Sequence, residues 1–153
     1  MPAALRSEYL MQLRGNLDKA LALGEVPQGI RRILHFTGGS FTGERLAGEI
    51  VPGGGDWVLT RRDGVSELDI RMTLRTGDGA LIYLESNGLF EISPENRARI
   101  EAGEDVDPAS YYFRTSQRYE TSAEKYSWLN RRITVGVGRR TPSGMVTEVF
   151  SIL

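Results

Sequence analysis

The chain has no cysteine and a single histidine, His35. The absence of cysteine excludes disulfides, thiolate metal ligands and a cysteine nucleophile. One histidine cannot build a multi-histidine zinc site, and no Gly-x-Ser-x-Gly elbow is present to indicate a serine triad. His35 lies in a short apolar run, where we expect it to pack rather than to catalyse. The sequence therefore predicts no metal site and no bound cofactor.

Lysine is also scarce, because 19 basic residues include only Lys19 and Lys125. The net charge of −1 offers no general attraction for nucleic acid or an anionic membrane, so we expect neither as a partner. No apolar run approaches the roughly 20 residues that cross a bilayer. The first eleven residues carry Arg6 and Glu8, unlike a signal peptide. We expect a cytoplasmic protein whose arginines could include planar forks for a carboxylate.

Strand patterns dominate what is present. Residues 67–75 alternate, with apolar side chains on one face and polar side chains on the other, which predicts a strand with one buried face. Further strands are predicted at 30–36, 46–51, 56–62, 80–86, 131–138 and 145–152, separated by turns rich in glycine. A helix is predicted from Pro94 to Ala102, because Ser93 can cap its start and Gly103 can end it. Residues 16–23 favour helix by propensity and strand by context.

These elements predict an all-β fold that consists of one domain over residues 1–153. We expect a single closed or nearly closed antiparallel β-barrel of about eight to ten strands with one short helix. A barrel of this size can hold one small ligand in its lumen. Residues 52–57 lack the Gly-Lys ending of a phosphate loop, so we expect a tight bend there that delivers Asp56 and Trp57 into the next strand.

The segment 111–130 combines aromatic and charged residues more densely than the rest of the chain. It contains four tyrosines, one tryptophan, one phenylalanine, two arginines and two glutamates. Aromatic walls with a few fixed charges are typical of a small-molecule pocket. The charged pairs Asp69 with Arg71 and Arg114 with Glu120 allow two interpretations. Each can be a solvent-exposed or structural ion pair, or a carboxylate-binding fork beside an acid or base.

The order and spacing of several short motifs resemble the DUF3237 family, also called UPF0311. The matching segments are TGGSFTG at 37–43, LAG at 46–48, PGGGDW at 52–57, DG at 63–64, LDIRMTL at 68–74, DGALI at 78–82, YFRT at 112–115, YET at 119–121 and YSWLN at 126–130. The similarity covers about residues 30–150. It implies a barrel like those of lipocalins and allene oxide cyclase, and a homo-oligomer, either dimer or trimer. Some members are linked to cofactor-independent breakdown of aromatic acids, including decarboxylation of lignin-derived dimers.

This resemblance suggests a cofactor-independent lyase, most concretely a decarboxylase of a phenolic carboxylic acid. Such an enzyme needs a carboxylate fork, an acid or base, an oxyanion donor and dry aromatic walls. We assign Arg114 or Arg71 to the carboxylate, Glu120 or Asp69 to proton transfer, and Tyr83 or Tyr112 to the oxyanion. Replacing Arg114 with alanine should then abolish turnover. The candidate substrate-binding residues are Phe41, Asp56, Trp57, Tyr112, Tyr126, Trp128 and Asn130.

Two alternatives stay open: a cofactor-free isomerase or cyclase, and a lipocalin-like binding protein for a small apolar or aromatic ligand without catalysis. A carrier needs an aromatic lumen but no paired charges, and a buried ion pair costs stability unless it has a role. If Asp69, Arg71, Arg114 and Glu120 lie on the outer surface, the carrier is favoured. If two or more of them converge in one lumen, the lyase is favoured.

Overall fold

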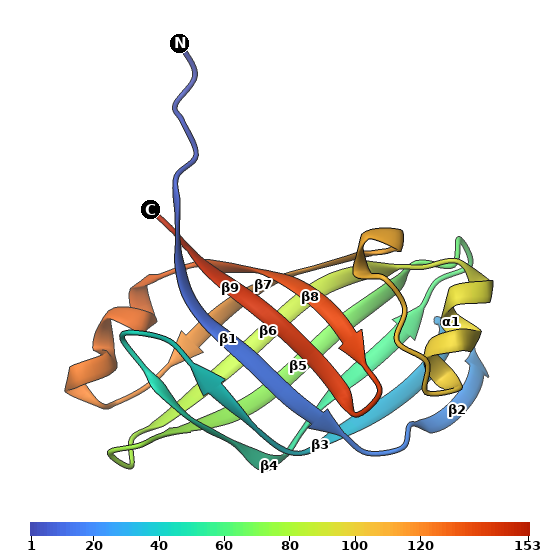
Figure 1. Cartoon of the computed structure of the whole chain (residues 1–153), viewed down its shortest axis with the longest axis horizontal. Coiled ribbons are helices and arrows are strands. Elements are labelled where there is room, and N and C mark those ends of the chain that lie inside the picture. Colours follow the sequence, from blue (N-terminus) through green and yellow to red (C-terminus); the bar gives the residue numbers. More distant parts are fainter.

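Nine antiparallel strands form the molecule, and the computed structural model describes residues 1–153. Eight of them close into a barrel, because β1 pairs with both β9 and β3, while β2 adds to the outer edge of β3. Figure 1 shows the closed barrel, with the N-terminal residues extending away from it. The strands are β1 (Ser7–Leu17), β2 (Leu21–Val26), β3 (Gly29–Thr42), β4 (Ala47–Thr60), β5 (Ser66–Thr76), β6 (Leu81–Glu91), β7 (Tyr112–Glu120), β8 (Thr134–Thr141) and β9 (Gly144–Ile152).

Strand β5 shows how the pattern of residues builds the barrel wall. Leu68, Ile70, Met72 and Leu74 are buried and alternate with partly or fully exposed polar residues. Each buried aliphatic side chain contributes roughly 1.5–3 kcal/mol relative to exposure. The wall is therefore held by its inward face, and the predicted all-β barrel is confirmed.

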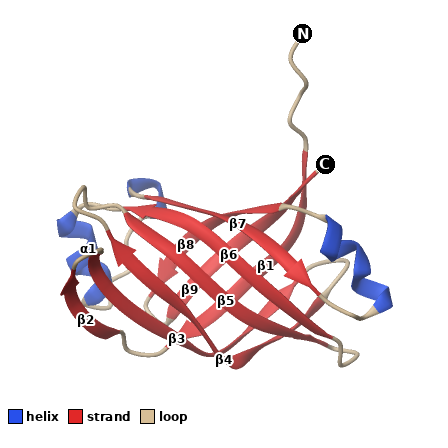
Figure 2. Cartoon of the chain, turned by 180° about the vertical axis from the view of Figure 1, so that it is seen from behind, coloured by secondary structure: helices blue, strands red, loops and turns tan.

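Short helical segments cover the two ends of the barrel. The predicted helix is confirmed as α1 (Pro94–Glu101), whose start is capped by the Ser93 hydroxyl, which accepts the Asn96 N–H at 3.1 Å. The 3-10 segments are η1 (Pro108–Ser110) and η2 (Glu124–Arg131). Figures 1 and 2 place α1 and η2 at opposite ends of the barrel. No helix is long and apolar enough to cross a membrane.

Strands β3 and β4 are longer than predicted. The prediction of separate strands at 46–51 and 56–62 was wrong, because β4 runs through Pro52 and the three glycines that follow. Its pairing with β5 shifts register between Val51 and Gly55, so the expected bend is an irregularity within one strand. A side chain at Gly54 would clash with the Arg71 carbonyl, so glycine permits this close approach of β4 to β5.

The ambiguous segment 16–23 contains no helix. It includes the end of β1 and the start of β2, since both pair with β3 and gain hydrogen bonds that local helix propensity cannot supply.

Candidate functional site

The barrel lumen is enclosed at the α1 end, where inward-facing side chains surround a cavity of about 40 Å³. Strands of the barrel and α1 together line it. The apolar lining residues are Leu17, Leu34, Val58, Leu68, Phe90, Ile100, Phe113 and Met145. The polar ones are Arg32, Asp56, Ser66, Arg97 and Arg140. Apolar walls with a few convergent polar groups are what a small-molecule site requires.

Asp56 is the carboxylate of this lumen. Its residue is 6% exposed, and its Oδ1 accepts the backbone N–H of Asp69 at 3.2 Å. Burial raises the pKa of Asp56 to about 7, although the Asp69 N–H and the charge of Arg140 oppose the rise. The group can therefore accept or donate a proton near neutral pH, as a general acid or base must.

Arg140 is positioned by β8 and by the hairpin to β9. Its Nε donates to the Gly144 carbonyl at 3.0 Å, and its backbone N–H donates to the Tyr111 hydroxyl at 2.9 Å. Burial lowers the pKa of Arg140, and the charge of Arg32 adds to this effect. The terminal nitrogens of Arg140 make no hydrogen bond within the protein, so a planar fork is left for an anion.

Two more arginines approach the same lumen from different elements. Arg97 of α1 donates from Nη2 to the Ser66 hydroxyl at 3.2 Å and lies 5.9 Å from the centre of the Phe90 ring. Burial lowers the pKa of Arg97, with a further contribution from Arg32. Arg32 of β3 forms an ion pair with Glu101 of α1 at 3.3 Å. Three guanidinium groups thus share the lumen with the single carboxylate of Asp56.

Tyr111 lies beside the lumen, just before β7. It is 8% exposed, and its ring lies 5.3 Å from that of Phe90. Burial raises the pKa of Tyr111, so its phenol keeps its proton at neutral pH. Since the hydroxyl oxygen accepts the Arg140 N–H, the O–H proton remains for donation to a nearby oxygen.

The middle and far end of the lumen are filled. A buried network runs through Gln117, whose amide nitrogen donates to Ser86 and Thr115 and whose amide oxygen accepts from Thr134. Glycine on β8 makes room for the packed floor, because a side chain at Gly138 would come within 2.5 Å of the Phe113 ring. The site is therefore confined to the α1 end.

The residues predicted for catalysis lie on the outer face. Arg71 approaches Asp69 at 3.6 Å and Glu85 at 3.9 Å, and the Tyr83 hydroxyl donates to Glu85 at 2.9 Å. The structure thus brings Asp69, Arg71 and Tyr83 together, but outside the barrel. The sequence did not determine whether these side chains face the lumen or the solvent, because strand periodicity does not show which face turns inward.

Arg114 and Glu120 also point outward from β7. Glu120 lies directly opposite Tyr83 in the β6–β7 pair and lines an open surface hollow with Tyr83 and Asn130, whereas Arg114 lies apart from this group. Arg114 lies 5.3 Å from the centre of the exposed Tyr112 ring and donates to the Phe113 carbonyl. Glu120 is exposed at the end of the strand. Catalytic roles for these residues stay predictions. Because Asp69, Arg71, Arg114 and Glu120 all lie on the outer surface, their placement favours a binding protein without catalysis.

Of the predicted substrate-binding residues, the lumen site contains Asp56. Phe41 and Tyr126 are buried in the core, and Trp128 stacks under Arg45, whose guanidinium carbon lies 3.7 Å from the ring centre. Asn130 bonds to the backbone of Thr121 at the η2 end. The segment 111–130 therefore contributes Phe113 to the lumen lining and Tyr111 to the support of Arg140, while most of it closes the opposite end.

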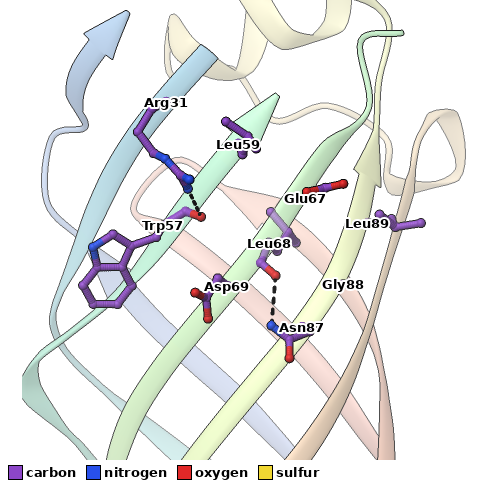
Figure 3. A pocket seen from close by; sticks show the side chains of 9 residues that line it. All are labelled: Arg31, Trp57, Leu59, Glu67, Leu68, Asp69, Asn87, Gly88 and Leu89. Atoms are coloured by element: carbon purple, nitrogen blue, oxygen red, sulfur yellow. Dashed lines mark hydrogen bonds between the residues drawn. The ribbon is translucent and has the colours of Figure 1, made fainter. Parts of the chain in front are cut away.

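Trp57 lines a second hollow, on the outer face of β3–β6 (Figure 3). Arg31 donates there to the Trp57 carbonyl at 3.0 Å, and Asn87 donates to the Leu68 carbonyl at 3.5 Å. This hollow is open to solvent along the barrel wall, and its two carboxylates, Glu67 and Asp69, already pair with Arg61 and Arg71. We therefore prefer the enclosed lumen as the candidate site.

Sequence reasoning missed Arg32, Arg97, Arg140, Ser66 and Tyr111. A signal for Arg32 existed, because it shares the face of Leu34 and Phe36 in an alternating strand. Arg140 was hidden, since β8 turns its glycines inward and exposes Val135 and Val137, the reverse of the usual pattern. Arg97 reaches the lumen from a helix, so strand periodicity could not indicate it.

A family model described as a protein of unknown function, DUF3237, matches residues 5–152. The chain belongs to the DUF3237 family. This DUF3237 protein is 32% identical over 153 residues to a UPF0311 protein of Rhodopseudomonas palustris, with both chains fully covered. It is 34% identical over 146 residues to a UPF0311 protein of Clostridium acetobutylicum, covering 95% of this chain and 92% of the relative.

Solved structures agree with the fold of this DUF3237 protein. The Rhodopseudomonas palustris protein, of unknown function, matches with a TM-score of 0.93 at 32% identity, over 99% of this chain and 100% of the other. A β-barrel-like protein of Acinetobacter baumannii matches with a TM-score of 0.86 at 36% identity, over 100% and 99%. A Penicillium herquei protein described as an enzyme shares the fold, with a TM-score of 0.74 at 20% identity over 100% and 98%.

Proposed function

We propose that this protein is a cofactor-independent lyase that acts on an aromatic carboxylic acid in the lumen, most concretely a decarboxylase of a phenolic acid. The observation that carries the proposal is the placement of Asp56 among three arginines inside an apolar, enclosed end of the barrel. A Penicillium herquei protein described as an enzyme has the same fold, so this type of barrel is compatible with catalysis.

The lumen residues match the requirements of this reaction. Arg140 and Arg32 orient the substrate carboxylate, and the walls formed by Phe90 and Phe113 hold the ring. Asp56 transfers protons, since its pKa lies near neutral pH. Tyr111 positions Arg140, because its hydroxyl accepts the Arg140 backbone N–H at 2.9 Å.

The substrate itself provides the electron sink. In a para-phenolic acid with an unsaturated side chain, loss of the phenol proton and protonation of the side-chain carbon that carries the carboxylate give a quinone methide. The bond to the carboxyl carbon then breaks, and its electron pair restores the double bond and the phenolate. Carbon dioxide leaves, and the phenolate regains a proton. Asp56 is the group that we assign to the side-chain protonation, and solvent then returns a proton to Asp56, so that the reaction consumes one proton overall.

The test is release of carbon dioxide from a panel of phenolic carboxylic acids. We expect Asp56→Asn to lower kcat by about 10²- to 10⁴-fold, the usual contribution of a general acid or base. Arg140→Met should abolish turnover, whereas Arg139→Met, one residue away on the same strand, should retain it.

Arg114→Ala distinguishes the lumen from the outer face as the active site. We expect this variant to keep wild-type turnover, because Arg114 points away from the lumen. Loss of turnover in Arg114→Ala with full turnover in Arg140→Met would overturn the lumen assignment in favour of the assignment made from the sequence.

A binding protein without catalysis is the second candidate. The observation that favours it is the outward placement of Asp69, Arg71, Arg114 and Glu120. If phenolic acids bind in the lumen, and Arg140→Met removes that binding, but excess protein converts none of them overnight, the carrier replaces the lyase.

A further inference from the structure

The lumen carries more positive charge than its own carboxylates balance. Arg32 has a partner in Glu101, at the rim. Arg97 and Arg140 form no ion pair, although the charge of Glu101 also attracts Arg97, and Asp56 is the carboxylate that lines the cavity with them. Because the pKa of Asp56 is about 7, a large part of it is neutral at physiological pH. The three guanidinium groups Arg32, Arg97 and Arg140 therefore share less than two full negative charges, those of Glu101 and of the partly neutral Asp56.

The hydrogen-bonding capacity of these two arginines is also largely unused. A guanidinium has five N–H donors. Arg140 uses one of them in the side-chain bond to Gly144, and Arg97 uses one in the bond to Ser66. Partly buried cations with unused donors favour anions that can accept two parallel bonds from each fork.

The two arginines belong to different parts of the molecule. Arg140 is on the barrel wall, whereas Arg97 is on α1, which has no buried residue. The cavity of about 40 Å³ has room for a few water molecules, and an aromatic acid needs several times that volume. A wider hollow of about 540 Å³ adjoins it and shares Arg32, Ile100 and Arg140. Outward movement of α1 would join the two spaces.

We propose that the ligand of this lumen is an aromatic molecule with two anionic groups, one bound by Arg140 on the barrel and the other by Arg97 on α1. This inference rests on the proposed function and specifies its substrate class. Because Arg97 is part of α1, binding of the second anionic group to Arg97 holds α1 over the aromatic ring. A ligand with one anionic group binds Arg140 alone, and it does not attract Arg97 of α1.

Binding of simple probes tests the proposal by titration calorimetry at pH 7 and low salt. The probes are benzoate, 4-hydroxybenzoate and the three benzenedicarboxylates, whose carboxylates differ in separation. We expect at least one dicarboxylate to bind tenfold or more tightly than benzoate, because each charged fork adds a charge-assisted contact. The 4-hydroxybenzoate arm shows whether a phenol can take the place of the second carboxylate.

Variants of the helix locate the second group. Arg97→Met should weaken binding of the best dicarboxylate about tenfold and leave benzoate affinity within about twofold. Arg99→Met is the matched control, since Arg99 lies on the same helix but pairs with Glu104, away from the lumen. In the wild type, the dicarboxylate should slow hydrogen exchange of the amides of residues 95–101 more than benzoate does.

Equal affinity for benzoate and all three dicarboxylates overturns the inference and leaves the proposed function standing. Equal weakening of benzoate and dicarboxylate by Arg97→Met also overturns it, because Arg97 would then serve the first anionic group. If benzoate and the dicarboxylates all fail to bind, the inference fails, and release of carbon dioxide from phenolic acids decides the proposed function separately.

Discussion

Asp56 shows how one residue connects the stability of this barrel to its proposed chemistry. A carboxylate on the inner wall loses hydration, and this loss outweighs the attraction of the nearby arginines. The resulting pKa near 7 is useful for proton transfer but unfavourable for folding at higher pH. Stability and function therefore make opposite demands on this position.

The substitution Asp56→Asn should change how the stability of the folded protein depends on pH. The pKa of Asp56 is 3.8 in its ordinary state and about 7 in the folded protein. Because the folded protein binds this proton more tightly than the unfolded chain, Asp56 contributes its full stabilisation below pH 4. That stabilisation is lost as the pH rises through about 7 and Asp56 ionises inside the barrel. The difference corresponds to up to about 4 kcal/mol at pH 8. Asparagine can still accept the Asp69 N–H, so Asp56→Asn should be more stable than the wild type at pH 8.

Urea unfolding at pH 5 and pH 8 measures this effect. The wild type should lose stability between the two values, and Asp56→Asn should lose less. A variant that is less stable than the wild type at pH 8, with the same pH dependence, would mean that Asp56 is ionised and well paired in the folded state.

At the scale of elements, the end of the barrel opposite the site is closed by a link between a turn and η2. Asp78, in the turn after β5, accepts from the Thr76 hydroxyl, from the Tyr126 hydroxyl at 3.0 Å and from Lys125 at 3.3 Å. These bonds, led by that of Thr76, lower the pKa of Asp78 to about 2. The closed η2 end leaves the α1 end as the way into the lumen.

The second prediction is that Asp78→Asn weakens this closure in a pH-dependent way. The folded pKa is below the ordinary value of 3.8, so the stabilisation is present above pH 4 and is lost as pH falls towards 2. The variant should be less stable than the wild type at pH 7, and the difference should narrow by pH 2.5. Thermal unfolding across this range measures it. Glu124→Gln, on η2 but without a bond to Asp78, should keep the wild-type pH dependence.

At the scale of the whole molecule, closure of the barrel determines which parts are stable. The eight barrel strands each have a neighbour on both sides, whereas β2 pairs only with β3 and α1 has no buried residue. Local opening is easiest where few groups are buried. Native-state hydrogen exchange should therefore release β2 and the helix α1 first, and the centres of β4, β5 and β6 last.

The same experiment bears on entry to the site. If α1 exchanges as slowly as β5, the helix does not open independently, and access to the lumen would require opening of the barrel itself. The homo-oligomer expected from the sequence stays a prediction, which light scattering of the purified protein can test.

Much of the fold could be predicted from the sequence. Alternation in β5, glycine-rich turns and the capped start of α1 are local features, and local features survive folding when packing agrees with them. The long strands β3 and β4 could not be predicted, because their irregularities are stabilised by pairing with distant strands. Asp56 was identified next to its glycine run, but its arginine neighbours come from β3, α1 and β8.

The sequence by itself determined the class of fold, and its lack of cysteine and of a second histidine narrowed the chemistry to arginine, carboxylate and tyrosine. Only the tertiary structure decided which of these residues face the lumen. The physical reason is that a strand has two faces, and the direction in which each turns depends on barrel closure rather than on local pattern. Closure turned Asp69 and Arg71 outward and gathered Asp56, Arg32, Arg97 and Arg140 inside.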